Sequence, residues 1–245
     1  LLDIIHNFIV FDAGIKKISR HNQYFGVVAA RKAVKAHKGG IIWHTQGSGK
    51  SLTMVWLAKW IRENIDNSRV LVLTDRRELD QQIESVFQGV DEQIYRTKSG
   101  RDLISQLSGV DLDSNSEFTV KWLLCSLIHK FGRNTDDTTD ADIDNYMNDI
   151  HQYLTESFQA KGDLFVFVDE CHRTQSGKLH DAMKKLLPNA TFIGFTGTPL
   201  LKADKNSIGV FGPYIHTYKY DEAVADKVVL DLRYEARRVD QNLSS

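Results

Sequence analysis

Short runs of apolar residues recur along the chain, with little of the alternation expected of a strand that has one face in water. Such runs are typical of strands covered on both faces, as in a parallel sheet between two layers of helices. They occupy residues 41–43, 70–74, 120–124, 164–168 and 191–196. The pattern therefore predicts a sheet whose strands are buried from both sides.

Helical periodicity fills the segments between these runs. Apolar side chains recur three and four positions apart in KSLTMVWLAKWIREN, in RRELDQQIESVF and in HDAMKKLLP, where Pro188 ends the pattern. Strands that alternate with helices predict an α/β fold, with a mostly parallel sheet and helices on both faces. Two stretches rich in Asp, Asn, Ser and Thr, at 111–116 and 133–149, are predicted to be surface insertions. The tail from residue 211 is predicted to form a turn, a helix and a strand that leave the domain.

Composition narrows the class of protein only in part. The 245 residues are 42% hydrophobic and 26% charged, which suits a globular chain with a sizeable core. The longest apolar runs fall far short of the ~20 residues that cross a membrane, so no membrane partner is expected. Two cysteines are too few for a disulfide framework, which makes the cytoplasm the default location. The net charge of −1 argues against binding a polyanion by bulk electrostatics, although local basic clusters could still contact phosphates.

The strongest chemical signal is IIWHTQGSGKS, where an apolar strand is followed by a small polar loop and then by an amphipathic helix that begins at Lys50. This is the layout of a phosphate-binding P-loop, although His44 stands where the usual pattern begins with glycine. The glycines let backbone N–H groups face phosphates, Lys50 neutralises oxygen charge, and Ser51 is a ligand for Mg²⁺. The predicted nucleotide-binding residues of the loop are Thr45, Gln46, Gly47, Ser48, Gly49, Lys50 and Ser51.

A second signal is LFVFVDECHRTQ, where an apolar strand delivers two adjacent carboxylates to the C-terminal edge of the predicted sheet. Ligands of open α/β sheets bind at that edge. Asp169 is predicted to hold Mg²⁺, and Glu170 to orient and deprotonate the water that attacks the γ-phosphate. Cys171 and His172 follow, but neighbouring side chains point apart and no further Cys or His has zinc-finger spacing, so the sequence disfavours a zinc site.

These two segments resemble motifs I and II of the superfamily 2 helicases, and DECH is a variant of their DEAD-box motif. GFTGTPL lies where motif III is expected. The resemblance implies a RecA-like P-loop domain that uses ATP and Mg²⁺, with Lys50 and Glu170 as catalytic residues. It also implies that His172, Thr196 and Thr198 couple the state of the nucleotide to DNA contacts.

Two further segments contact the DNA backbone in that family. VLVLTDRRELDQQI resembles motif Ia, which implies phosphate contacts from Arg76 and Arg77. LLCSLIHKFG lies where motif Ib is expected, and the resemblance implies contacts from Ser126 and Lys130. Cys125 and Ser126 replace two threonines of the family pattern, which weakens the match at this segment.

RHNQYFGVVAA precedes the P-loop and resembles the upstream segment of the restriction subunit of type I restriction-modification enzymes, where a glutamine recognises adenine. Gln23 is the matching residue. With the FG…Y…EAVAD tail, the motifs resemble this subunit over most of the chain. The resemblance implies ATP-driven translocation on double-stranded DNA, modification and specificity subunits as partners, and a nuclease domain outside this chain. Type III restriction subunits and chromatin-remodelling motors share the core motifs and are alternatives.

The implied organisation is a connecting segment with the adenine-recognition helix at 1–36, a RecA-like domain at 37–212, and an exit segment at 213–245 toward a second RecA-like lobe outside the chain. Such motors complete their site with arginines from the second lobe, so we expect the chain alone to bind ATP weakly, with almost no DNA-stimulated hydrolysis and no DNA cleavage. A P-loop kinase and a non-catalytic nucleotide sensor are rivals from other classes. A kinase has no need of the DECH and TGT segments.

Overall fold

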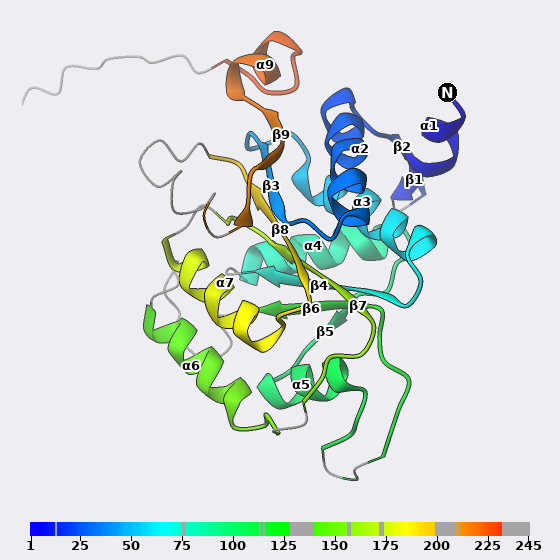
Figure 1. Cartoon of the computed structure of the whole chain (residues 1–245). Coiled ribbons are helices and arrows are strands. Elements are labelled where there is room, and N and C mark those ends of the chain that lie inside the picture. The colour runs from blue at the N-terminus through cyan, green and yellow to red at the C-terminus, as the bar shows by residue number, and fades with distance from the viewer. Residues whose placement is uncertain are drawn as a thin grey trace, which may run out of the picture.

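A seven-stranded sheet forms the centre of the structure, which is a computed structural model (Figure 1). In spatial order the strands are β5 (Tyr95–Arg96), β6 (Leu123–Leu127), β4 (Ser68–Thr74), β7 (Asp163–Val168), β8 (Thr191–Thr196), β3 (Gly40–His44) and β9 (Tyr214–Tyr218). Each pair of neighbours is parallel, as the sequence predicted. The structure describes residues 1–12, 14–74, 77–112, 114, 116–127, 140–155, 158–171, 174–198, 209 and 211–231, and only the backbone of 77–82, 140 and 174–178.

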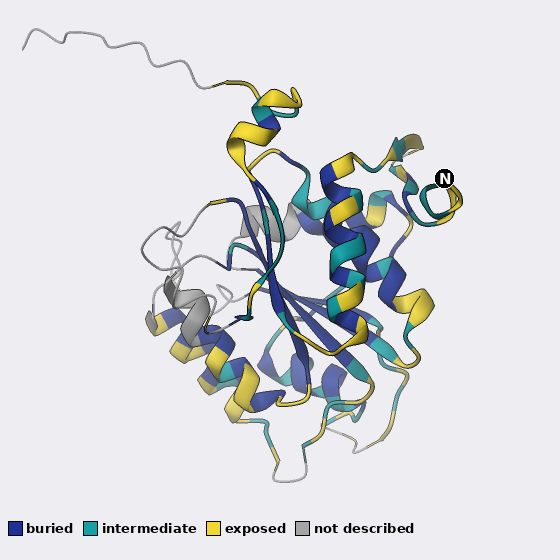
Figure 2. Cartoon of the chain, turned by 45° about the horizontal axis from the view of Figure 1, so that its top comes forward, coloured by how far each residue is buried: buried dark blue, intermediate teal, exposed yellow. Residues whose placement is uncertain are grey.

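Helices cover both faces of the sheet (Figure 1). One layer consists of α2 (His21–Lys35), α3 (Lys50–Asn64) and α4 (Arg77–Gly89), and the other of α5 (Gly100–Ser108), α6 (Asp140–His151) and α7 (Thr174–Leu186). Along β4, Val70 and Val72 belong to the core under the first layer, whereas Leu71 and Leu73 belong to the core under the second. The strands lack polar alternation because both faces are buried (Figure 2). Within the described ranges, no helix is long and apolar enough to cross a membrane.

The stretch predicted as a surface insertion at 133–149 contains most of a core helix, α6. This helix buries four apolar side chains, Ile143, Tyr146, Met147 and Ile150. They are three and four positions apart, so α6 has a continuous apolar face although most of its residues are polar. The prediction was wrong here because it followed the Asp and Asn content of the segment and missed this spacing. The run predicted at 120–124 corresponds to β6, which begins three residues later.

The tail also differs from its predicted order of turn, helix and strand. Strand β9 comes first and pairs in parallel with β3 at the edge of the sheet, and α9 (Tyr220–Ala225) follows it. The YIHTY sequence of β9 has the β-branched and aromatic residues that suit a strand. We call residues 214–231 the exit arm. Figure 1 shows it running beside β3 and continuing beyond the sheet into α9.

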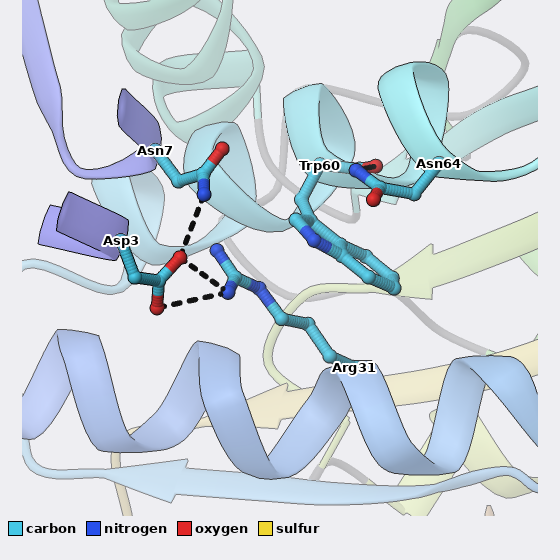
Figure 3. Close-up of polar contacts among 5 residues, drawn as sticks. All are labelled: Asp3, Asn7, Arg31, Trp60 and Asn64. Carbon is cyan, nitrogen blue, oxygen red and sulfur yellow. Dashed lines mark hydrogen bonds and ion pairs between the residues drawn. The ribbon is translucent and has the colours of Figure 1, made fainter. Parts of the chain in front are cut away.

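The first residues form α1 (Leu2–Asn7) and an antiparallel hairpin of β1 (Ile9–Asp12) and β2 (Ile15–Ile18). Arg31 of α2 holds α1 in place, because its Nη1 donates to Oδ1 and Oδ2 of Asp3 at 2.9 and 3.2 Å (Figure 3). Asn7 Nδ2 donates to the same carboxylate at 2.6 Å. The Arg31 guanidinium lies 4.7 Å from the ring centre of Phe8 and 5.2 Å from that of Trp60, which is the geometry of cation–π contacts.

Arg69, at the start of β4, is a buried cation that binds backbone carbonyls. Its guanidinium donates to the oxygens of Gln106 at 2.7 Å and Leu107 at 3.0 Å, near the C-terminus of α5. It also donates to the oxygens of Lys121 at 3.1 Å and Lys161 at 3.2 Å. The carbonyl groups at a helix C-terminus carry partial negative charge, so this arrangement stabilises the cation and joins three segments of the chain.

Candidate nucleotide-binding site

The predicted P-loop lies between β3 and α3, as its sequence layout requires. Gly47 and Gly49 have φ values of +81° and +86°, in the left-handed region that favours glycine. Thr45 and Ser48 are buried, and the Ser48 hydroxyl donates to the carbonyl oxygen of Thr45. Gln46 and Gly47 form the exposed tip of the loop. The backbone therefore turns at the start of a long helix, where N–H groups and the helix dipole favour an anion.

The fold brings the acidic pair to the same edge of the sheet as the P-loop. Strand β7 ends at Val168, and Asp169 and Glu170 follow it directly. Lys50 Nζ lies 3.9 Å from Glu170 Oε1, and both side chains are largely buried. Asp169 Oδ1 accepts the backbone N–H of Glu170 at 3.0 Å, while Glu170 itself has a φ of +48°. The cation and both carboxylates predicted for the site are thus next to one another.

The residues after β8 lie against the P-loop. A Cβ on Gly197 would be 2.8 Å from Lys50 Nζ and 3.3 Å from the backbone nitrogen of Gln46, so a side chain at this position would displace the lysine. Thr196 is buried, and its hydroxyl accepts the N–H of Thr198 at 3.3 Å. The segment expected to be motif III therefore lies against Lys50, the lysine predicted to bind phosphate. His172, the other predicted coupling residue, lies outside the described residues.

Helix α2 supports the P-loop from one side. Gln23 Nε2 donates to the carbonyl oxygen of Gly49 at 3.0 Å, and its Oε1 accepts the N–H of Arg20 at 2.8 Å. Asn22 Nδ2 donates to the carbonyl oxygen of Ser48 at 3.3 Å. Gln23 thus lies beside the loop, and both ends of its amide bind the backbone of the chain. Its contact with adenine stays a prediction.

His44 is buried where the usual P-loop pattern has glycine. Its Nε2 is 2.9 Å from Nδ1 of His216 in β9, and Gly26 of α2 makes room for the pair, since a Cβ there would be 2.8 Å from the His44 ring. Burial lowers the pKa of His44 to about 3, with further lowering by the charges of His216 and Lys50. His44 is therefore neutral at pH 7. Nothing in the sequence pointed to His216, because the pairing of β9 with β3 was not predicted.

Cys171, which follows the acidic pair, is a packed thiol. Its Sγ would be 2.6 Å from a Cβ on Gly194, so the two residues are in close contact. Burial, reinforced by the charges of Asp169 and Glu170, raises the pKa of this thiol well above its usual value. The protonated form is then the one present, which suits packing and neither nucleophilic attack nor metal binding.

The predicted DNA contacts are only partly described. Arg76 and Lys130 lie outside the described residues, and Arg77 begins α4 without a described side chain. Ser126 is buried in β6, where its hydroxyl is 2.9 Å from that of Tyr146 and accepts that of Thr97 at 3.0 Å. This placement corrects the expectation for Ser126, because its hydroxyl is used inside the fold and does not face a phosphate.

Comparison with known proteins agrees with the motifs. The sequence model of the SWI2/SNF2 ATPase family matches residues 22–245. The type I restriction enzyme HindI endonuclease subunit of Haemophilus influenzae is 32% identical over an alignment of 275 positions, which covers 99% of this chain and 24% of that protein. The SsaAORF53P endonuclease subunit of a type I restriction enzyme from Staphylococcus saprophyticus is 31% identical over 81% of this chain and 20% of its own length. The chain thus spans about a fifth to a quarter of these relatives, and the predicted resemblance to type I restriction subunits is confirmed.

Solved structures confirm the RecA-like fold. The type ISP restriction-modification enzyme LlaBIII bound to DNA superimposes with a TM-score of 0.58 at 16% identity, over 86% of this chain and 16% of that one. The Sulfolobus solfataricus SWI2/SNF2 ATPase core in complex with double-stranded DNA gives a TM-score of 0.54 at 14% identity, over 91% and 40% of the two chains. At these identities the likeness establishes the fold alone. Since the family match covers nearly all of the sequence, the chain belongs to the SWI2/SNF2 ATPase family.

Proposed function

We propose that this chain is the ATP-hydrolysing front lobe of a motor that translocates on double-stranded DNA within a type I restriction enzyme. One observation supports its chemistry most directly: Lys50 and Glu170, far apart in sequence, are 3.9 Å apart at the carboxyl edge of the sheet, beside Asp169 and Gly197. A P-loop lysine beside an acidic pair is the half of the machinery for hydrolysis of a nucleoside triphosphate that one lobe supplies.

Each residue has a role that its chemistry suits. Lys50 and the backbone of the loop hold the β- and γ-phosphates. The Ser51 hydroxyl and the Asp169 carboxylate are oxygen donors of the kind that Mg²⁺ prefers, and they would hold it against the phosphates. Mg²⁺, when bound, neutralises charge on the phosphate oxygens. Glu170 would orient the attacking water and accept its proton.

The names and titles of the similar proteins support the restriction and DNA parts of the proposal. The curated relatives are endonuclease subunits of type I restriction enzymes, and the two superimposed structures contain DNA. We therefore propose double-stranded DNA and the modification and specificity subunits as partners. A second RecA-like lobe would supply the arginines that complete the site, and a separate nuclease domain would cut the DNA.

The first experiment measures ATP–Mg²⁺ binding by calorimetry. Lys50→Ala removes the cation aimed at the phosphates, and we expect at least a tenfold loss of affinity, or about 1.4 kcal/mol. Lys59→Ala is the matched control, since Lys59 lies on the same helix and pairs with Glu92 at 3.3 Å. Equal affinity of Lys50→Ala and wild type would reject the P-loop assignment.

The second experiment measures turnover in a chain extended by its native flanking sequence. Glu170→Gln should still bind ATP but release almost no phosphate with linear duplex DNA present, because an amide cannot accept the proton of water. Normal hydrolysis by this variant would place the base elsewhere. Transfer of phosphate to a small acceptor in preference to water would support the alternative of a P-loop kinase.

Gln23 tests the recognition of the base. If Gln23 recognises adenine, Gln23→Ala should weaken the binding of ATP several-fold more than the binding of GTP, as expected for the loss of about 1 kcal/mol of hydrogen bonding. Its bond to the carbonyl of Gly49 suggests a different role, in support of the loop. An equal loss for the two nucleotides would assign that supporting role.

A further inference from the structure

Tyr218, the last residue of β9, lies where the exit arm meets the P-loop. Its carbonyl oxygen accepts the backbone N–H of Thr45 at 2.9 Å, just as the loop leaves β3. Its ring is buried, with its centre 6.1 Å from that of His44 and 5.4 Å from that of His21 at the start of α2. Both ring pairs are close to perpendicular, an arrangement favoured between aromatic side chains. Tyr218 therefore contacts the P-loop strand and α2 at once.

The hydroxyl of Tyr218 ties this contact to the end of α9. It donates to Asp226 Oδ2 at 2.9 Å, and the same oxygen is 2.9 Å from Nε2 of His21. Burial and the bond to Asp226 raise the pKa of Tyr218 to about 12, so the hydroxyl keeps its proton and remains a donor. Asp226 thus holds the turn after α9 against both β9 and α2.

From that turn the exit arm returns to the tip of the P-loop. The N–H of Val229 donates to the carbonyl oxygen of Ala223 in α9 at 3.3 Å. One γ-methyl of Val229 is 3.2 Å from the place that a Cβ on Gly47 would occupy. The arm therefore contacts the loop at two points, at Thr45 through a hydrogen bond from its backbone to Tyr218 and at Gly47 through Val229.

The P-loop thus has supports from two elements. Asn22 and Gln23 of α2 hold the carbonyl groups of Ser48 and Gly49, and the exit arm contacts Thr45 and Gly47. A loop with two glycines in left-handed conformations has much backbone freedom to lose when it binds phosphates. Supports that restrict the loop before binding reduce that entropic cost and so increase affinity.

We propose that Tyr218 is a positioning residue for phosphate binding, which acts by fixing the exit arm against the P-loop through its ring and its bond to Asp226. The inference rests on the proposed nucleotide site. It implies that the arm, which the sequence suggested was only a connection, is part of the nucleotide-binding structure. Because the effect is on the phosphate cradle, it is independent of the base.

The test compares Tyr218→Phe with Tyr153→Phe, a tyrosine near the end of α6 on the other side of the sheet. We expect Tyr218→Phe to weaken the binding of ATP, GTP and inorganic tripolyphosphate by the same factor, about threefold to tenfold, as expected for the loss of one hydrogen bond. Hydrogen exchange should be faster at residues 44–49, while the melting temperature changes little. Asp226→Ala should reproduce both effects, and Asp221→Ala, on the exposed side of α9, should not.

Affinities of Tyr218→Phe and Asp226→Ala within a factor of two of wild type would overturn the inference. So would a loss confined to ATP, which would indicate a contact with the base, or a general rise in exchange over the whole sheet, which would indicate a structural role. These outcomes are distinct from failure of the proposed function, in which wild type would bind none of the three ligands or Lys50→Ala would bind them as well as wild type.

Discussion

The buried His44 should make the fold sensitive to mild acid. In the folded chain burial holds the pKa of this imidazole at about 3, against an ordinary 6.5 when the chain unfolds. Below pH 6.5 the unfolded state therefore binds a proton that the folded state does not. The stability contributed by neutral His44 is complete above that pH and is lost progressively as the pH falls from 6.5 toward 3.

The difference in proton binding between the folded and unfolded states gives the size of this effect on stability. For one group with these two pKa values, the free energy of unfolding falls by about 2 kcal/mol between pH 7 and pH 5. The pKa values of His216 and His180 are also lowered, mainly by burial, so they act in the same direction. The difference between wild type and a variant at position 44 isolates the contribution of His44.

Urea denaturation followed by circular dichroism at pH 7, 6 and 5 measures this difference. His44→Gln keeps a hydrogen-bonding group toward His216 but does not titrate, so its loss of stability over this range should be about 2 kcal/mol smaller than that of wild type. His151→Gln, at the exposed end of α6, is the control, and its free energy of unfolding should fall as much as that of wild type. Equal acid losses in His44→Gln and wild type would refute the reasoning.

Three further predictions follow from contacts described above. Arg69→Met removes the guanidinium that donates to four backbone carbonyls and should lower the free energy of unfolding in urea by about 3 to 5 kcal/mol, with a smaller loss for Arg69→Lys; a cost below 1 kcal/mol would contradict this. Gly197→Ala should lower ATP affinity several-fold by displacing Lys50 Nζ, and calorimetry that finds unchanged affinity would show that the lysine adapts. Arg31→Ala should speed hydrogen exchange over residues 1–12, since the Asp3 and cation–π contacts are lost, while slow exchange there would mean that other contacts hold α1.

The sheet, and the place of the P-loop sequence between β3 and α3, could be predicted from the sequence for a physical reason. Strands buried on both faces must be apolar throughout, and a P-loop needs its glycines and lysine in consecutive positions, so both features are local in sequence. The core position of α6 and the order of the elements in the tail were harder to predict. They depend on which face of a helix meets the sheet and on which strand pairs with β3. His216 and Tyr218 reach the P-loop only through that pairing. The two ends of the Gln23 amide likewise find their partners only when α2 is placed against the loop.

At Glu170 a strained backbone conformation and a proposed catalytic role occur in the same residue. A residue other than glycine with a φ of +48° costs on the order of 1 kcal/mol, and the strand end and the packed Cys171 keep it there. A glycine at this position would release that strain, yet it would remove both the carboxylate proposed to activate water and the ion-pair partner of Lys50. Relief of the backbone strain and retention of the proposed base are therefore incompatible at this position, as expected of strain held at a functional site.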